Sequence, residues 1–260
     1  MNVVVCMKQV PDTTAKKELS PDFTLNREAL EKVVNPFDEY AIEEALRIKE
    51  RSGGAVTILT MGPESAEESV RKALAMGADS AVLVCDSALH GTDWFGTCVV
   101  LAKALESIEY DLILTGMEST DARMGLVPAG LAEMLDLPLV TLVSKLEPHD
   151  GTVRANRQVS GGYQEVETSL PAVVSVVKGA NEPRYPSLKG IMAAKRKTIE
   201  KRGLSDLGIP TAQVGLQGAK TQVTAVTPRP EKTAGQVVKP ESPEEAARVV
   251  ADFLQERKFI

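Results

Sequence analysis

Short runs of apolar residues, rich in valine and isoleucine, alternate along the chain with longer segments in which apolar residues recur every three or four positions. A short β-branched run is typical of a strand buried on both faces, whereas the longer period is typical of a helix with one buried face. The pattern predicts strands at residues 2–7, 55–61, 80–85, 111–115, 139–143 and 171–177. It predicts helices between them at residues 36–51, 64–76, 92–106 and 126–135. Strands that alternate with helices at this spacing indicate an α/β fold with a doubly wound, mainly parallel sheet.

The second half of the chain departs from this alternation. Residues 152–159 and 163–169 alternate polar and apolar positions, and Ser160-Gly161-Gly162 between them is a hairpin signal. Glycine and proline recur beyond residue 197, a composition with little capacity to form its own core. A last helix is predicted at 242–257, where Ser242 and Glu245 form a capping box. We therefore predict an α/β domain with an added β-hairpin at 1–197 and an extended C-terminal arm at 198–260.

Charge and cysteine content exclude several classes of protein. The net charge of -6 and the pI near 5.2 argue against a nucleic-acid-binding protein, which needs a basic face. No apolar run is long enough to be inserted into a membrane, and Met1 leads directly into a predicted strand without a signal segment, so we expect a cytoplasmic protein. The 3 cysteines suggest no disulfide framework, and neither they nor the 2 histidines have metal-ligand spacing, so no metal site is predicted.

A nucleotide site is the best-supported local feature. In open α/β sheets ligands bind at the carboxyl ends of the strands. These ends bring together Cys6 and Lys8, Met61-Gly62, and the loop from Gly116 to Asp121. Asn35 lies alongside as the expected N-cap of the first helix. Backbone N–H groups of a loop that opens with glycine and leads into a helix suit a phosphate. Ordinary βα turns would have the same spacing, so this pattern alone leaves both interpretations open.

Residues 181–197 combine a rigid loop with a cluster of positive charge. Two prolines in the segment Asn181-Glu182-Pro183-Arg184-Tyr185-Pro186 exclude both a helix and an inner strand. Ser187 can then cap a short helix at 188–197, which carries four cations and one leading apolar side chain, Leu188. Taken alone, the helix is either a solvated helix end whose cations complement the dipole or a docking surface for an acidic protein.

Three separated blocks decide between these interpretations. The first runs from Gly161-Gly162 through LPAVVSV at 170–176 to NEPRYPSLKGIMAAKRK at 181–197. The others are NPFDE at 35–39 with AIEEALRIKE at 41–50, and ALAMGAD at 73–79. In this order they resemble the β subunits of electron transfer flavoproteins, a family that includes the FixA proteins. The resemblance covers almost the whole chain and implies a Rossmann-like fold similar to that of the adenine nucleotide α hydrolases.

The resemblance also implies a function and partners. Such a subunit is an electron carrier and not an enzyme, and it forms a heterodimer with an α subunit that holds most of the FAD. The heterodimer takes electrons from dehydrogenases of the acyl-CoA type in fatty acid oxidation and passes them to a membrane quinone oxidoreductase. The β subunit also binds AMP, and its C-terminal arm packs on the α subunit.

By the same resemblance, individual residues acquire roles. The cofactor-binding set would be Cys6, Asn35, Pro36, Phe37, Asp38, Met61, Leu112, Gly116, Ser119, Thr120 and Asp121. Thr13 and Phe37 would cover the isoalloxazine of FAD, although Phe37 suits the core of its helix equally well. The loop at 181–189 would recognise dehydrogenases, with Leu188 inserted into an apolar pocket. The partner-binding set would be Glu182, Arg184, Tyr185, Leu188, Ile191, Met192 and Lys195.

One block departs from the family pattern. The loop GMESTDARMG at 116–125 is shorter than the GxQAxDxDxxQxG of the family and has Glu118 in place of an amide. A carboxylate beside a phosphate is unfavourable unless Arg123 neutralises it. Two alternatives therefore stay open: a bifurcating relative with its own FAD on this subunit, and a nucleotide-sensing or ATP-hydrolysing protein of similar topology. Ser160-Gly161-Gly162 resembles the pyrophosphate loop of ATP-cleaving enzymes but lies in a hairpin.

Overall fold

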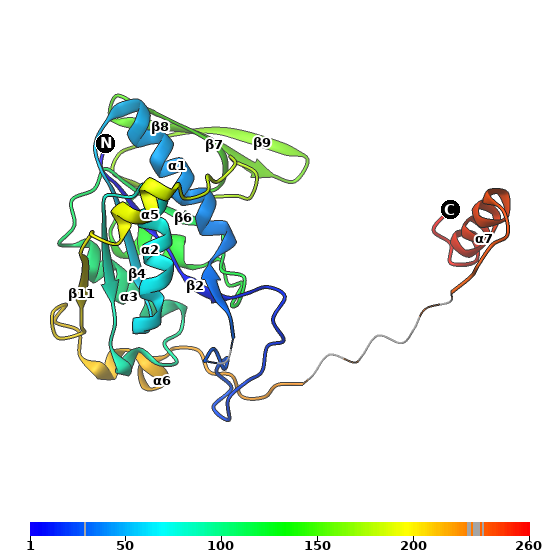
Figure 1. Cartoon of the computed structure of the whole chain (residues 1–260), viewed down its shortest axis with the longest axis horizontal. Helices are drawn as coiled ribbons and strands as arrows, with labels where there is room; N and C mark the ends of the chain where they lie inside the picture. Colours follow the sequence, from blue (N-terminus) through cyan, green and yellow to red (C-terminus); the bar gives the residue numbers. More distant parts are fainter. Residues whose placement is uncertain (29, 228–229, 231–234, 236) are drawn as a thin grey trace. The chain divides into compact units, whose positions relative to one another are not determined.

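The structure, a computed structural model, describes residues 1–28, 30–227, 230, 235 and 237–260 (Figure 1). It divides the chain into two compact units, Met1–Val223 and Thr224–Ile260. Residues 198–223, which we expected in the arm, belong to the first unit. Leu204, Ile209 and Val214 from this stretch are all buried. The division between the units therefore lies later than the predicted boundary at residue 197.

The first unit is built on a nine-stranded sheet in the order β11-β5-β4-β1-β6-β10-β7-β8-β9. Its strands are β1 (Val3–Cys6), β4 (Val56–Met61), β5 (Ser80–Val84), β6 (Leu112–Gly116), β7 (Leu139–His149), β8 (Thr152–Val159), β9 (Gly162–Ser169), β10 (Ala172–Val176) and β11 (Ile199–Arg202). The pairs from β11 to β7 are parallel, and only β7–β8 and β8–β9 are antiparallel. The predicted doubly wound, mainly parallel sheet with an added hairpin is confirmed.

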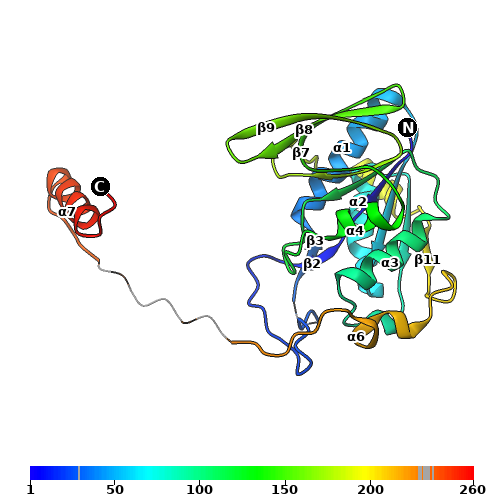
Figure 2. The ribbon, with the colours of Figure 1, turned by 180° about the vertical axis from the view of Figure 1, so that it is seen from behind.

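Helices cover both faces of the sheet, as Figures 1 and 2 show from opposite sides. One face carries α1 (Pro36–Ser52), α2 (Glu67–Met76) and α5 (Leu188–Ala194), and the other carries α3 (Trp94–Leu105) and α4 (Val127–Met134). The inner strands β1, β4, β5, β6 and β10 contribute to both cores by alternation. In β1, for example, Val3 and Val5 belong to the first core, and Val4 and Cys6 to the second. This two-sided burial explains why the inner strands are continuous apolar runs.

Shorter elements lie around this framework. The strands β2 (Gln9–Pro11) and β3 (Lys32–Val34) form a separate antiparallel pair that closes the excursion at 12–31. The remaining short helices are η1 (Glu64–Ala66), η2 (Ser87–Leu89), η3 (Thr211–Gln213) and α6 (Gly215–Gly218). β7 extends well beyond its predicted end, to His149, because β8 pairs along it. The helix predicted at 188–197 is shorter, since α5 ends at Ala194.

The second unit contains α7 (Pro243–Glu256). Ser242 caps this helix as predicted, because its Oγ accepts from Glu245 N at 3.1 Å. The return bond of the predicted capping box is shifted by one residue, since Glu245 Oε2 accepts at 2.8 Å from the backbone of Glu241, the residue before the N-cap. Val250 and Phe253 are exposed on this helix. None of the helices in the part of the chain that the structure describes is both long and apolar enough to cross a membrane.

Candidate functional site

The carboxyl ends of β1, β4 and β6 meet at one edge of the sheet. β1 lies between the other two, with Cys6 in register with Leu59 on β4 and with Thr115 on β6. The predicted residues Cys6, Met61 and Gly116 are therefore brought to the same edge. Leu112 is not part of this group, because it is the first residue of β6, pairs with Val3 at the opposite end of the strand and is fully buried.

The start of α1 is tied to this edge by the side chain of Asn35. Asn35 occupies the N-cap position, but its side chain makes no capping hydrogen bond to α1. Its Nδ2 instead donates to Asp38 Oδ1 at 2.8 Å and to the Glu118 carbonyl at 2.9 Å. Its Oδ1 accepts from Thr120 N at 3.2 Å. Asn35 thus holds the loop at 116–125 against the helix start.

Asp38 is the hub of this arrangement. Its carboxylate also accepts from Lys8 N at 2.7 Å and from Gly116 N at 3.2 Å, so it joins α1 to the loops after β1 and β6. Burial raises the pKa of Asp38 to about 7, although hydrogen bonds from Lys8, Asn35 and Gly116 oppose the shift. A Cβ at Gly116 would lie 2.4 Å from Asp38 Oδ1, so only glycine fits there.

Asp121, predicted as a cofactor ligand, is committed to the protein itself. Its side chain has no exposed surface, and its two oxygens accept from Lys8 Nζ at 2.8 Å and from Arg27 Nη2 at 2.5 Å. Burial alone would raise its pKa, but the two cations hold the pKa of Asp121 down to about 2. Sequence reasoning brought Lys8 to this end of the sheet but did not pair it with Asp121, and it missed Arg27 altogether. Arg27 lies in the excursion at 12–31, and no local pattern indicates where the excursion folds back.

The unusual Glu118 has the neutralising partner that its position requires. Arg123 Nη1 lies 3.5 Å from Glu118 Oε1, and the Glu118 side chain is 20% exposed. Ser119 Oγ lies 3.4 Å from Lys8 Nζ. The carboxylate of Glu118 thus stays partly exposed and paired with Arg123, so the loop accommodates a glutamate where the family has an amide.

Several buried hydroxyls at this end of the sheet lack a hydrogen-bond partner within the described residues. Thr115 Oγ1 and Thr120 Oγ1 belong to this group. Thr60 Oγ1 is a third such atom, but its side chain lies on the opposite face of the sheet from Thr115, because Leu59 and Thr115 are both in register with Cys6. A buried polar atom without a partner is destabilising, and a polar ligand can satisfy it. Thr115 lies on the same face of the sheet as Cys6 and is the next-to-last residue of β6. The edge therefore suits a ligand with hydroxyl or amide groups, such as a nucleotide.

The remaining predicted cofactor residues line the start of α1. Pro36 and Phe37 are half-buried, and Thr13 is exposed on the excursion. Burial raises the pKa of the Cys6 thiol, with the Asp38 carboxylate adding to the effect, so Cys6 is a neutral thiol and not a nucleophile.

The segment at 181–197 presents an apolar patch to solvent. Tyr185 is 94% exposed and Leu188 is 84% exposed, and Ile191 and Met192 follow on α5. Ser187 Oγ caps α5 by accepting from Gly190 N at 3.0 Å. Glu182 and Lys195 are also exposed, whereas Arg184 is drawn back into contact with α1. Most of the predicted partner-binding residues are thus on one accessible surface.

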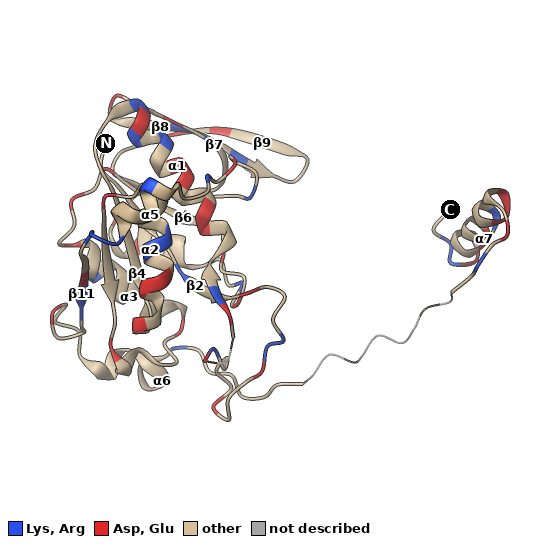
Figure 3. Cartoon of the chain, in the orientation of Figure 1, with Lys and Arg blue, Asp and Glu red and all other residues tan. Residues whose placement is uncertain are grey.

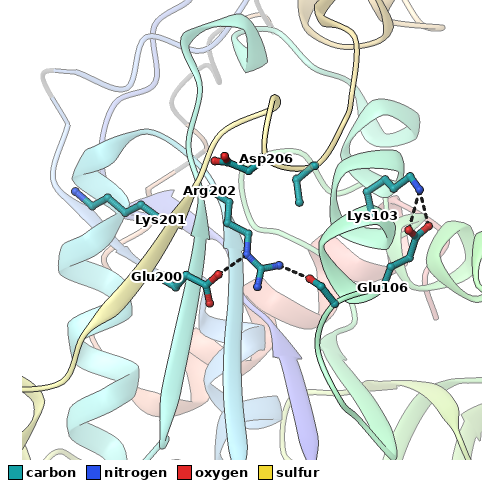
Figure 4. Close-up of a pocket in the computed structure, with 8 residues that line it drawn as sticks. Lys103, Glu106, Glu200, Lys201, Arg202 and Asp206 are labelled. Atoms are coloured by element: carbon teal, nitrogen blue, oxygen red, sulfur yellow. Dashed lines mark hydrogen bonds and ion pairs between the residues drawn. The ribbon is translucent and has the colours of Figure 1, made fainter.

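A groove elsewhere on the first unit is not a second candidate. Figure 4 shows Lys103 paired with Glu106 and Arg202 paired with Glu200, and Arg202 also donates to Ser107 Oγ. The other charged side chains of the groove are engaged as well, Lys201 with Glu67 and Asp206 with the backbone of Gly203. No buried group lacking a partner lines it among the residues described there. The paired charges leave no feature that selects a ligand.

Comparison with known proteins identifies the family. The model of the electron transfer flavoprotein domain matches residues 22–207. An electron transfer flavoprotein subunit beta of Mycobacterium bovis is 45% identical over 100% of this chain and 99% of the relative. The chain belongs to the electron transfer flavoprotein family, as a β subunit. The subunit beta of Bacillus subtilis is 39% identical over the full length of both chains, and protein FixA of Azotobacter vinelandii is 36% identical over 92% of this chain and 88% of FixA. The family predicted from the three sequence blocks is confirmed.

Membership of this family implies a partner chain and a cofactor class. An electron transfer flavoprotein subunit is named as a carrier component, and a subunit called beta implies an alpha subunit. The family implies association with a flavin.

Proposed function

We propose that this chain is the β subunit of a heterodimeric electron transfer flavoprotein that accepts electrons from acyl-CoA-type dehydrogenases and passes them to a membrane quinone oxidoreductase. The observation that carries the proposal is the apolar patch of Tyr185, Leu188, Ile191 and Met192, which is exposed on a segment that the protein holds in place. Burying one leucine contributes roughly 1.5–3 kcal/mol before ordering costs. Such a contact suits a carrier that must leave its partner as well as bind it.

The proposed cofactors are FAD, shared with the α subunit, and AMP. FAD supplies the one- and two-electron chemistry when bound. Thr13 and Phe37 are the residues of this chain that would cover the flavin, and Thr13 is exposed as that role needs. AMP would be held at the edge formed by Cys6, Met61 and Gly116. The unpartnered hydroxyls of Thr115 and Thr120 support a polar ligand there.

The proposed α-subunit contact uses the second unit. The capped helix α7 has an apolar side with Val250 and Phe253 exposed, and Phe259 and Ile260 follow it. An amphipathic helix of this kind gains most of its stability from packing against another surface. We propose that the α subunit provides that surface, and that the heterodimer works in the cytoplasm.

Coexpression with a flavin-binding α subunit tests the proposal. We expect the two chains to copurify with one FAD and one AMP per heterodimer, and the bound FAD to be reduced by an acyl-CoA dehydrogenase with its substrate. Two FAD per heterodimer would favour the bifurcating alternative instead. ATP turnover by this chain without any flavin would contradict the proposal.

A further inference from the structure

Arg184 is held against α1 by the carboxylates of two glutamates, Glu43 and Glu50. Its Nε donates to Glu43 Oε2 at 2.8 Å, and its Nη2 donates to Glu43 Oε1 and to Glu50 Oε2 at 3.1 Å each. Its Nη1 donates to Glu50 Oε1, and its backbone N–H donates to Glu43 Oε2 at 3.1 Å. All three guanidinium nitrogens are therefore committed to one helix.

The carboxylates that receive Arg184 belong to α1, whose acidic residues are the red bands in Figure 3. The Glu43 side chain is only 4% exposed, and that of Glu50 is 56% exposed. Burial raises the pKa of Glu43, but hydrogen bonds from Arg184 and Arg47 outweigh burial and leave it below its usual value. Hydrogen bonding to Arg184 likewise lowers the pKa of Glu50. Both carboxylates are thus ionised at neutral pH.

Asn181 makes a second tie between the same segment and the same helix. Its Nδ2 donates to the Tyr40 carbonyl at 3.0 Å and to Glu44 Oε2 at 3.1 Å. The Glu44 side chain is 9% exposed. Asn181 and Arg184 thus fix the start of the loop, while Tyr185, the next residue, is almost fully exposed. Arg184 is thus bound to α1, whereas the side chain of the very next residue points into solvent.

We propose that Arg184 is a positioning residue and not a partner contact: by binding Glu43 and Glu50 it fixes the loop on α1 and so presents Tyr185 and Leu188 to the dehydrogenase. The inference rests on the proposed docking function and replaces the direct partner-binding role predicted for Arg184. A bidentate arginine orders a loop more strongly than a lysine can, because its planar fork matches two carboxylates at once. A loop held in its binding geometry loses less conformational entropy on docking.

The test uses the complete heterodimer with its FAD and a partner dehydrogenase. Arg184→Gln and Glu43→Gln are made singly and together, and kcat, KM and hydrogen exchange of the amides at 185–190 are measured. We expect each single change to raise KM about fivefold with kcat unchanged, to speed exchange in the loop, and to show no further effect in the double variant, since neighbours in one network are non-additive.

Three further variants keep the result decisive. Arg184→Lys preserves the charge but not the fork, so it should behave like Arg184→Gln. Arg47→Gln is the matched control, because Arg47 donates to Glu43 at 2.9 Å but lies on α1 itself, and it should leave KM unchanged. Glu50→Gln, at an exposed carboxylate, provides a milder loss of the same tie if Glu43→Gln lowers FAD content.

Direct contact between Arg184 and the dehydrogenase predicts different results. Arg184→Gln would then raise KM, whereas Glu43→Gln, at a side chain that a partner cannot reach, and loop exchange would stay as in the wild type. Rescue by Arg184→Lys would likewise overturn the proposal. Failure of docking itself is separate, because Leu188→Ala would then leave KM unchanged.

Discussion

Asn35 donates a hydrogen bond from its Nδ2 to Oδ1 of Asp38 across 2.8 Å, and both side chains are buried. The pair links α1 to two loops at the carboxyl edge of the sheet, since Asn35 holds Glu118 and Thr120, and Asp38 holds Lys8 and Gly116. The start of α1 is therefore hydrogen-bonded to the loops that follow β1 and β6, where a helix start usually caps its own backbone. The geometry of the candidate nucleotide site therefore depends on this one pair.

Replacing Asp38 with asparagine tests the buried carboxylate. With a pKa of about 7 against an ordinary 3.8, folded Asp38 holds a proton that the unfolded chain releases between these pH values. The contribution of Asp38 to the free energy of unfolding of the wild type should therefore fall as pH rises from 4 to 7. Asp38→Asn lacks this component, so its stability relative to the wild type should improve across that window in urea denaturation.

The same measurement can contradict the raised pKa of Asp38. If the difference in stability between Asp38→Asn and the wild type stays constant from pH 4 to pH 7, the carboxyl group titrates alike in the folded and unfolded chains and its pKa is not raised.

Asp121→Asn should show the opposite dependence on pH. The pKa of Asp121 is held at about 2 by Lys8 and Arg27, so its ionised form stabilises the fold above pH 3.8, and this stabilisation disappears as pH falls toward 2. We expect the variant to be about 2–3 kcal/mol less stable than the wild type at pH 7, because lowering the pKa of a carboxyl group from 3.8 to about 2 corresponds to a free energy of about this size. The difference should narrow on acidification between pH 4 and pH 2. A constant difference would mean that Asp121 acts through packing alone.

Gly116→Ala tests the closeness of α1 to β6. The added methyl would meet Asp38 Oδ1 at 2.4 Å and the Phe37 backbone carbon at 2.8 Å, so α1 must move or the hydrogen bond to Asp38 must break. A loss of about 1–3 kcal/mol in the free energy of unfolding is expected. Gly162→Ala is the matched control, because a Cβ there meets nothing within 4 Å. Equal stability of the two variants would show that α1 can retreat freely.

The arrangement of elements was predictable from the sequence because buried strands and one-sided helices leave different periods. The edge that carries Cys6, Met61 and Gly116 follows from that arrangement, since parallel strands end together. The register within β6 was less accessible: Leu112 was assigned to the site but lies at the far end of its strand, because the resemblance alone placed it.

Long-range polar contacts could not be predicted. Asn35 has the residue type and position of a helix cap, and nothing local indicates that its amide turns to the loop at 116–125 instead. The contact of Arg27 with Asp121 and that of Arg184 with Glu43 join residues far apart in sequence. Charged side chains carry no periodic signal that specifies a partner, so these contacts emerge only from the fold.

Thr115→Val tests the nucleotide site. Valine has nearly the shape of threonine, so the change removes only a buried hydroxyl that has no hydrogen-bond partner among the residues the structure describes. If AMP satisfies that hydroxyl, the variant heterodimer should retain FAD but contain less AMP, measured by chromatography of the nucleotides released on denaturation. Thr60→Val is the control, since Thr60 lies on β4 with its side chain on the opposite face from Met61. Equal AMP content in both variants would place the ligand away from Thr115.

Leu188→Ala tests the apolar patch as a docking site. Leu188 is 84% exposed and makes no part of either core, so its truncation should leave folding and FAD content unchanged. If the side chain enters a pocket on the dehydrogenase, losing its buried surface should raise KM by roughly tenfold, the equivalent of about 1.4 kcal/mol. Val250→Ala on α7 is the contrasting variant, because it should weaken association with the α subunit and not docking. Loss of FAD from Leu188→Ala, or an unchanged KM, would show that the patch serves the α subunit or has no role in electron transfer.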